Sequence, residues 1–146
     1  MIRQATLSDL DCLIFLEHSC FNSDRLSHRQ LRYMLTQANG QILVAEQSGA
    51  ILGYGLLLFK KNSSISRLYS IAVASTARRK RIGEALVRES EIFAQTRGST
   101  ALRLEIRVDN HASLRLFHQL GYKKIKELRG YYEDGTDGVR LEKQFK

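Results

Sequence analysis

The residues with the clearest potential for chemistry lie in the segment "TARRKRIGEAL", where Arg78, Arg79, Lys80 and Arg81 directly precede an amphipathic run. A helix N-terminus already carries partial positive charge from its free N–H groups. Four cations there repel that charge and one another, so the arrangement suits a loop that binds an anion. Because an apolar strand pattern precedes the loop, backbone N–H groups and guanidinium groups together predict a diphosphate site. A solvated basic helix start and a nucleic-acid patch remain alternatives.

The composition is that of a folded globular protein. The 146 residues are 43% hydrophobic and 26% charged, which fits one domain over residues 1–146. A net charge of +8 favours anionic partners. Nucleic acid is the weaker choice, because no aromatic residues interleave with the basic run.

Nothing in the sequence points to a membrane. The longest apolar stretch, Ala50–Phe59, is too short to cross a bilayer, and no leader pattern opens the chain. Cys12 and Cys20 lie eight residues apart in an expected helix, beyond disulfide reach. Two free thiols favour a reducing compartment, so we expect a cytoplasmic protein. The oligomeric state is expected to be a monomer or a homodimer.

The elements that must position the basic loop follow from periodicity and capping. Thr6 with Asp9 and Ser27 with Gln30 predict two helix starts. The expected order is β α α β β β α β α β β, a mixed α/β domain. Strands are expected over residues 1–6, 41–47, 51–59, 66–73, 101–108, 122–128 and 139–145. The helix after the loop is expected to bury Ile82, Ala85, Leu86, Ile92 and Phe93 and to end near Gly98.

Two segments together resemble the GCN5-related N-acetyltransferases. "SIAVASTARRKRIGEALV" is similar to their acetyl-CoA-binding segment, with Arg78 to Gly83 on its pattern Arg/Gln-x-x-Gly-x-Gly/Ala. "LEIRVDNHASLRLFHQLGY" is similar to a later segment, and "GYYEDGTDGVRLEK" to the ending of the bacterial ribosomal-protein alanine N-acetyltransferases. The resemblance implies a central, mostly antiparallel sheet of six to seven strands, flanked by about four helices.

The resemblance also implies acetyl-CoA as co-substrate. The main chain of Ile71 and Val73 is expected to bind the pantetheine arm like an added strand, and Asn110 to contact the cofactor. Asn110 also fits the N-cap of a helix. The expected cofactor-binding residues are Ile71, Ala72, Val73, Arg78, Arg79, Lys80, Arg81, Ile82, Gly83, Glu84, Ala85, Asn110, Ser113 and Phe117.

The chain departs from the family pattern at two positions. Arg81 stands where the family has its first glycine, which lets the backbone approach the phosphates. We expect Arg81 to have helical dihedral angles and an outward side chain, so that its N–H stays available. Phe117 stands where many relatives have a tyrosine thought to protonate the leaving thiolate, and phenylalanine has no proton to give.

Acetyl transfer to an amine needs a base and a way to handle the leaving thiolate. Glu105 matches the family's catalytic glutamate and is the first candidate base, and the alternative is a surface pair with Arg103 or Arg107. Glu46, at a strand end expected to face the same cleft, is the second candidate base. Candidate acids are Tyr122, Tyr131 and Tyr132. Water is another, and the thiolate can also leave unprotonated.

The acceptor is expected to be an amine on a protein or peptide, because an N-terminal amine is easier to deprotonate than a lysine. A small-molecule amine, a non-catalytic acyl-CoA-binding module and a nucleic-acid-binding protein are the competing interpretations. The four histidines lack metal-ligand spacing with the cysteines, so no metal is expected. Since no nucleophile motif is present, we expect direct attack by the amine without an acetyl-enzyme intermediate.

Overall fold

The fold is described from a computed structural model that covers residues 1–22, 24–37, 39–78 and 81–146. The strands are β1 (Ile2–Gln4), β2 (Gly40–Gln47), β3 (Ala50–Phe59), β4 (Ile65–Val73), β5 (Ala101–Arg107), β6 (Lys123–Leu128) and β7 (Gly138–Gln144). The α-helices are α1 (Leu10–Cys20), α2 (His28–Thr36), α3 (Ile82–Thr96) and α4 (His111–Gln119). Short 3-10 helices span η1 (Leu7–Asp9) and η2 (Ser75–Ala77). The order of strands and α-helices is the predicted one.

One seven-stranded sheet runs in the order β1-β2-β3-β4-β5-β7-β6. Neighbouring strands are antiparallel except β4 and β5, which are parallel because α3 crosses from one to the other. The predicted mixed, mostly antiparallel sheet with four flanking helices is confirmed.

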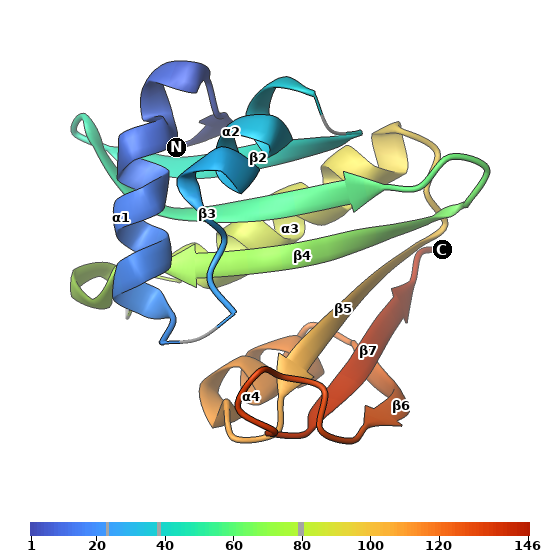
Figure 1. Cartoon of the computed structure of the whole chain (residues 1–146). Coiled ribbons are helices and arrows are strands. Elements are labelled where there is room, and N and C mark those ends of the chain that lie inside the picture. Colours follow the sequence, from blue (N-terminus) through green and yellow to red (C-terminus); the bar gives the residue numbers. More distant parts are fainter. Residues whose placement is uncertain (23, 38, 79–80) are drawn as a thin grey trace.

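The two parallel strands separate along their length. β4 and β5 pair from Ile65–Arg67 to Ala101–Arg103, and the ladder ends there. Figure 1 shows the carboxyl-terminal halves of β4 and β5 spreading apart, so that the sheet opens like a V. The carboxyl ends of parallel strands are a common place for ligands in α/β proteins.

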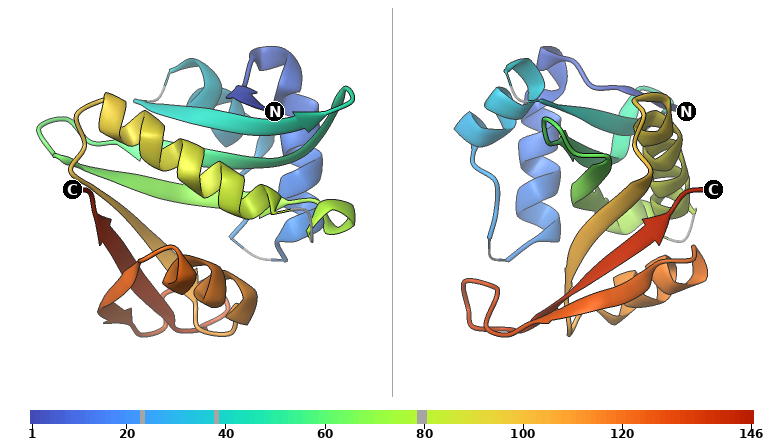
Figure 2. Two further views of the ribbon diagram at one scale, coloured as in Figure 1. Left: turned by 180° about the vertical axis from the view of Figure 1, so that it is seen from behind. Right: turned by 90° about the vertical axis from the view of Figure 1, so that its right-hand side faces the viewer.

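The helices cover both faces of the sheet. α1 and α2 lie on one face of β2–β4 and α3 on the other, while α4 packs beside β5 and β7 (Figure 2). The two capping boxes are present as predicted, Thr6 with Asp9 and Ser27 with Gln30. In the part of the chain that the structure describes, no helix combines the length and apolar character needed to cross a bilayer.

The buried face of α3 differs from the predicted one. Leu86 is buried, but Ile92 is 54% exposed and Ala85 faces solvent. Buried instead are Val87, Ser90, Glu91 and Ala94. Glu91 replaces an apolar residue on this face because it accepts hydrogen bonds from buried Tyr122 and from Lys143. A polar residue with buried partners cannot be found from an apolar stripe alone.

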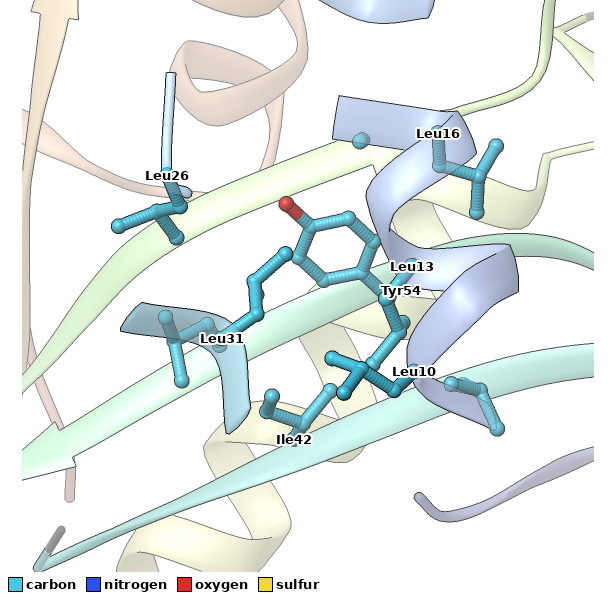
Figure 3. Close-up of a cluster of buried hydrophobic side chains, with 10 residues drawn as sticks. Leu10, Leu13, Leu16, Leu26, Leu31, Ile42 and Tyr54 are labelled. Carbon is cyan, nitrogen blue, oxygen red and sulfur yellow. The ribbon is translucent and has the colours of Figure 1, made fainter. Parts of the chain in front are cut away.

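One cluster of the core joins α1 and α2 to the sheet. Figure 3 shows Leu10, Leu13 and Leu16 of α1 packed with Leu26, Leu31, Ile42 and Tyr54. Tyr54 has no exposed surface, and its hydroxyl points away from Leu10 and Ile42, towards the side of Leu26. This packing fixes α1 beside the carboxyl-terminal part of β4, which has already separated from β5.

Candidate functional site

A cavity of about 360 Å³ lies where β4 and β5 separate. Its wall is formed by α1 and the segment after it, by β4 and β5, by the start of α4, and by the β6–β7 connection. Seven residues predicted from the sequence line it: Ile71, Glu105, Asn110, Ser113, Phe117, Tyr131 and Tyr132. The fold therefore brings predicted cofactor and catalytic residues from four separate segments to one cavity.

The edge of β4 towards this gap carries main-chain groups without a strand partner. Ala74 N donates to Leu52 O of β3, and main-chain N–H and C=O groups alternate in direction along a strand. The main-chain groups of Ala72 therefore point towards β3, and those of Ile71 and Val73 point towards the gap. The Val73 carbonyl accordingly accepts from Cys20 Sγ (3.4 Å) and from Arg78 Nε (3.3 Å). A ligand with amide groups can pair with this edge as another strand would.

A bulge lies in the middle of β4. Leu56 pairs with Ser70 and Leu57 with Leu68, which leaves Tyr69 as the extra residue. Bulges redirect side chains and main-chain groups at functional sites. Here the bulge comes just after the β4–β5 ladder ends and lies in the cavity wall.

The basic loop leads from η2 into α3. Arg79 and Lys80 lie outside the described residues. Arg81, the N-cap of α3, has φ 59° and ψ 25°, so the expectation of right-handed helical angles is wrong. The position requires the left-handed conformation that glycine adopts without strain, which explains why the family pattern has glycine there.

The first turn of α3 holds the other predicted loop residues. Ile82, Gly83, Glu84 and Ala85 do not line the cavity and lie beyond the end of β4. A Cβ on Gly83 would be 3.5 Å from Leu116 and 3.8 Å from Val73. Gly83 thus lies where α3, α4 and β4 meet. The first turn of α3 also has free N–H groups that are available to a ligand of the basic loop.

The start of α4 supplies a polar edge to the cavity. Asn110 is the N-cap of α4, and its side chain accepts a hydrogen bond from Ser113 N at 3.2 Å. Phe117, one turn further on, is 1% exposed and packs edge-on against Tyr122. Its ring closes the wall and offers no proton.

Glu105 is held by two guanidinium groups. Its side chain is 6% exposed, Oε1 pairs with Arg67 of β4, and Oε2 accepts from Arg140 Nε of β7 at 2.9 Å. The alternative partners are engaged elsewhere, Arg103 with Glu142 and Arg107 with Asp109 and Asp134. A carboxylate has about four lone-pair sites, so Glu105 can still accept a hydrogen bond from water.

Two of the three candidate tyrosines line the cavity. Tyr131 and Tyr132 pack edge to face, and Arg67 Nη2 donates to the Tyr131 hydroxyl at 3.2 Å. Burial raises the pKa of Tyr132 to about 12, so its hydroxyl keeps its proton at neutral pH. Both residues come from the β6–β7 connection, in which Gly135 N donates to Tyr132 O at 2.9 Å and closes a turn.

Tyr122 and Glu46 lie elsewhere, and the structure corrects both placements. Tyr122 is 2% exposed and donates to Glu91 Oε2 at 2.7 Å, which fixes its hydroxyl against α3 and away from the cavity. Glu46 contacts Arg3 at 3.1 Å on the β1 side of β2. Since β3 and β4 separate β2 from the gap, Glu46 does not face the cleft.

The residues of the site that were missed from the sequence include Glu17, Arg67, Tyr69 and Arg140. In the sequence, Arg67 and Arg140 look like ordinary polar positions of amphipathic strands. They are 73 positions apart, and no sequence pattern predicts that they contact the same carboxylate. Glu17 had a detectable signal. It lies four residues after Leu13, on the buried face of α1, where a carboxylate is unusual.

The residues present fit a coenzyme A thioester. The β4 edge offers amide-pairing groups, the α3 turn offers free N–H groups, and Arg78 and Arg81 offer positive charge. Among the residues that the structure describes, no group of three or more His, Cys, Asp or Glu side chains is placed to hold a metal ion.

The chain belongs to the acetyltransferase (GNAT) family, whose family model matches residues 8–122. It is an acetyl-CoA-dependent N-acetyltransferase. An N-alpha-acetyltransferase of Sulfurisphaera tokodaii is 30% identical, over 96% of this chain and 90% of that protein.

Two solved structures share the fold. The ribosomal-protein-S18-alanine N-acetyltransferase from Escherichia coli has a TM-score of 0.88 at 22% identity, over 99% of this chain and 93% of that one. A chain of the NatC complex bound to Gag peptide and CoA has a TM-score of 0.86 at 22% identity, over 100% and 98% of the two chains.

Proposed function

We propose that the protein transfers the acetyl group of acetyl-CoA to the N-terminal amine of a protein or peptide. The observation that carries this proposal is the cavity at the β4–β5 divergence. It is bounded by an unpaired strand edge on one side and by the α1–α2 and β6–β7 connections on the other. The unpaired strand edge can pair with an amide-containing cofactor arm. The side with the two connections leaves an opening for the end of a peptide chain.

The cofactor is proposed to run along β4 into the loop before α3. The main chain of Ile71 and Val73 pairs with the pantetheine arm, in place of the Arg78 contact that Val73 O now has. Arg78, Arg81 and the N–H groups of the α3 turn bind the diphosphate, with Arg79 and Lys80 in the same loop. Asn110 and Ser113 contact the cofactor from the start of α4.

Two considerations support an N-terminal amine as acceptor. Relatives over nearly the whole chain carry the name N-alpha-acetyltransferase. Deprotonating an N-terminal amine of pKa near 7.8 costs about 1.1 kcal/mol at pH 7, against about 4.6 kcal/mol for lysine at 10.4. The β5 side of the cavity offers a carboxylate that is already neutralised by two arginines, so the less basic amine suits it better.

Glu105 is proposed as the base. Since each of its oxygens already has a guanidinium partner, it acts through a water molecule on its remaining lone pairs. The neutral amine nitrogen then attacks the thioester carbon, the C–N bond forms and the C–S bond breaks. The surplus proton on the nitrogen leaves through the same water molecule to Glu105. Tyr132, which remains protonated, is proposed to give its proton to the leaving thiolate, with Tyr131 beside it.

The cellular setting is also a proposal. Cys12 is exposed and Cys20 half-buried, and both are free thiols, which favours a reducing cytoplasm. The oligomeric state is proposed to be a monomer or a homodimer, and sedimentation at working concentration distinguishes the two.

The decisive experiment incubates the protein with acetyl-CoA and a panel of peptides, followed by mass spectrometry. The panel varies the first residue and includes internal lysines and N-terminally blocked controls. Acetyl groups on free N-termini support the proposal. Acetylation of lysines in blocked peptides, or of none of the peptides while small amines release CoA, overturns it.

A further inference from the structure

A second carboxylate, Glu17 of α1, lines the same cavity and has an unusual environment. Its residue is 2% exposed. Oε2 accepts a hydrogen bond from Leu26 N at 2.7 Å, and Oε1 accepts one from the Tyr54 hydroxyl. Within the described residues, no Lys, Arg or His side chain forms an ion pair with it.

A buried carboxylate without a cation is costly. Removing a charged group from water is unfavourable by several kcal/mol unless a partner of opposite charge replaces the solvent. Two hydrogen bonds use about half of the lone-pair sites of Glu17. The remaining sites, and the missing positive charge, indicate that a cation binds here for part of the working cycle.

The charged neighbours of Glu17 do not supply that cation. Arg67 in the cavity wall is paired with Glu105, and Arg107 with Asp109 and Asp134. Asp24, from the segment after α1, is itself acidic. The other titratable groups nearby are the Cys20 thiol and the phenols of Tyr54, Tyr69, Tyr131 and Tyr132.

Glu17 lines the cavity together with Phe21, Asp24 and Leu26 of the α1–α2 connection, the side proposed to receive the acceptor. Tyr54, which bonds Glu17, lies 3.5 Å from Ser70 Oγ in the β4 bulge, directly before Ile71. Figure 3 shows the Tyr54 hydroxyl directed out of the apolar cluster towards the side of Leu26. Burial, followed by the charge of Glu17, raises the pKa of Tyr54, so this phenol stays a donor.

We propose that Glu17 binds the acceptor amine as an ammonium ion before Glu105 and water remove its proton. The inference rests on the proposed function, because it names the group that receives the acceptor. The ammonium supplies the cation that Glu17 lacks and brings the nitrogen beside the β4 bulge. Attack on the thioester then requires the neutral amine.

This division has a pH signature. An N-terminal amine has a pKa of about 7.7–8.0, so the ammonium form predominates below that range. Affinity for the acceptor is therefore highest at lower pH, and KM rises as the pH passes about 8. The rate constant kcat rises over the same range, because the neutral amine becomes more abundant. A carboxylate that served structure alone would not couple KM to the charge of the acceptor.

The experiment compares an alanine-initiated peptide with its desamino analogue, which lacks the N-terminal nitrogen. Binding of each is measured by calorimetry in the presence of CoA, for the wild type and three variants. Glu17→Gln removes the charge and keeps an acceptor oxygen. Tyr54→Phe keeps the charge and removes one hydrogen bond. Glu127→Gln changes an exposed carboxylate on β6.

The expected result is a wild-type preference of about tenfold to a hundredfold for the free amine, typical of a hydrogen bond to a charged group. The preference disappears in Glu17→Gln and at pH 9.5, and it persists in Tyr54→Phe and Glu127→Gln.

Three results overturn the inference: no preference in the wild type, an unchanged preference in Glu17→Gln, or an equal loss in Tyr54→Phe. The wild-type comparison needs no variant to fold. If the peptide binds with this preference and is never acetylated, the proposed function fails and the ammonium site stands. If it is acetylated without the preference, the ammonium site fails alone.

Discussion

The two sides of the gap between β4 and β5 satisfy their charges in different ways. On the β5 side, each charge has a protein partner. Glu105 lies between Arg67 and Arg140, and Arg107 contacts Asp134 at 2.8 Å. The charges on this side are paired within the protein, without a ligand.

On the side formed by α1 and the start of α3, charges lack such partners. In the described ranges, Glu17 has no cation within pairing distance, and neither Arg78 nor Arg81 contacts a carboxylate. The negative charge lies in the cavity near the β4 bulge, and the positive charges follow the end of β4.

The difference distinguishes charges that hold the site together from charges that bind ligands. Paired groups fix side-chain geometry, including that of Glu105, the proposed base. Unpaired groups are proposed to bind the charge that is missing, an ammonium at Glu17 and the diphosphate of CoA at Arg78 and Arg81. The following variants test that distinction.

The largest effect is expected at the paired carboxylate. Glu105→Gln removes the proposed base, so kcat at pH 7 should fall by about a hundredfold to ten-thousandfold. The loss should shrink at high pH, where the amine is already neutral. Initial rates of CoA release between pH 6 and 10 measure it.

Because Glu105→Gln also leaves two arginines without a counter-charge, a melting curve must accompany the rates. Glu142→Gln, which removes the partner of Arg103 on the same pair of strands, is the matched control and should keep the wild-type profile. Equal rates for Glu105→Gln and the wild type at every pH would remove Glu105 from the proton path.

The next effect concerns an unpaired cation of the loop. Arg78→Gln should weaken CoA binding by about tenfold or more, since one charge-assisted contact to phosphate is lost. The wild-type affinity should fall with added salt, and the variant's affinity should fall less. Calorimetry at two salt concentrations measures both.

Arg88→Gln is the control for the loop, because Arg88 lies one turn further along α3 and is paired with Glu84. It should bind CoA as the wild type does. The distinction between paired and unpaired charges is wrong if both substitutions weaken binding equally.

A smaller effect separates the charge of Arg81 from its backbone conformation. Arg81→Gly relieves a left-handed residue, so the protein should gain about 1 kcal/mol of stability and melt about 3 °C higher. CoA affinity should fall in the same variant, since a cation is lost. Thermal melts without CoA measure the gain in stability, and melts with CoA measure the loss of affinity. If Arg81→Gly melts at a lower temperature than the wild type without CoA, the left-handed conformation of Arg81 is not strained.

The fold was predictable because its signals are local. Thr6 with Asp9 and Ser27 with Gln30 mark helix starts whatever surrounds them. The strand expected over residues 101–108 is observed as Ala101–Arg107, and Leu102, Leu104 and Ile106 are buried. α3 was predicted less well, since Glu91 is buried by partners from β7 and from the segment after α4.

The lining of the cavity was predictable where one segment supplies it. Ile71, Asn110 and Glu105 were placed by short motifs and reach the cavity. Glu46 and Tyr122 lie away from the cavity, because the strand order puts Glu46 on the β1 side of the sheet and Glu91 of α3 accepts the hydrogen bond of the Tyr122 hydroxyl. The partners of Glu105 come from β4 and β7, and periodicity within one strand contains no information about them.

The smallest effect concerns a paired carboxylate away from the cavity. Arg3 Nη1 contacts Asp9 Oδ2 at 2.8 Å, and this hydrogen bond lowers the pKa of Asp9 from 3.8 to about 2. A carboxyl group with a lowered pKa in the folded state stabilises the protein above its unfolded pKa and loses that contribution as the pH falls from about 4 to about 2. Asp9→Asn should therefore lower stability by about 1 kcal/mol at pH 7 and by little at pH 2. Denaturant unfolding at the two pH values measures the difference. A constant gap between wild type and variant would mean that Asp9 acts through its capping-box hydrogen bonds and not through its charge, so that the ion pair with Arg3 contributes nothing to stability.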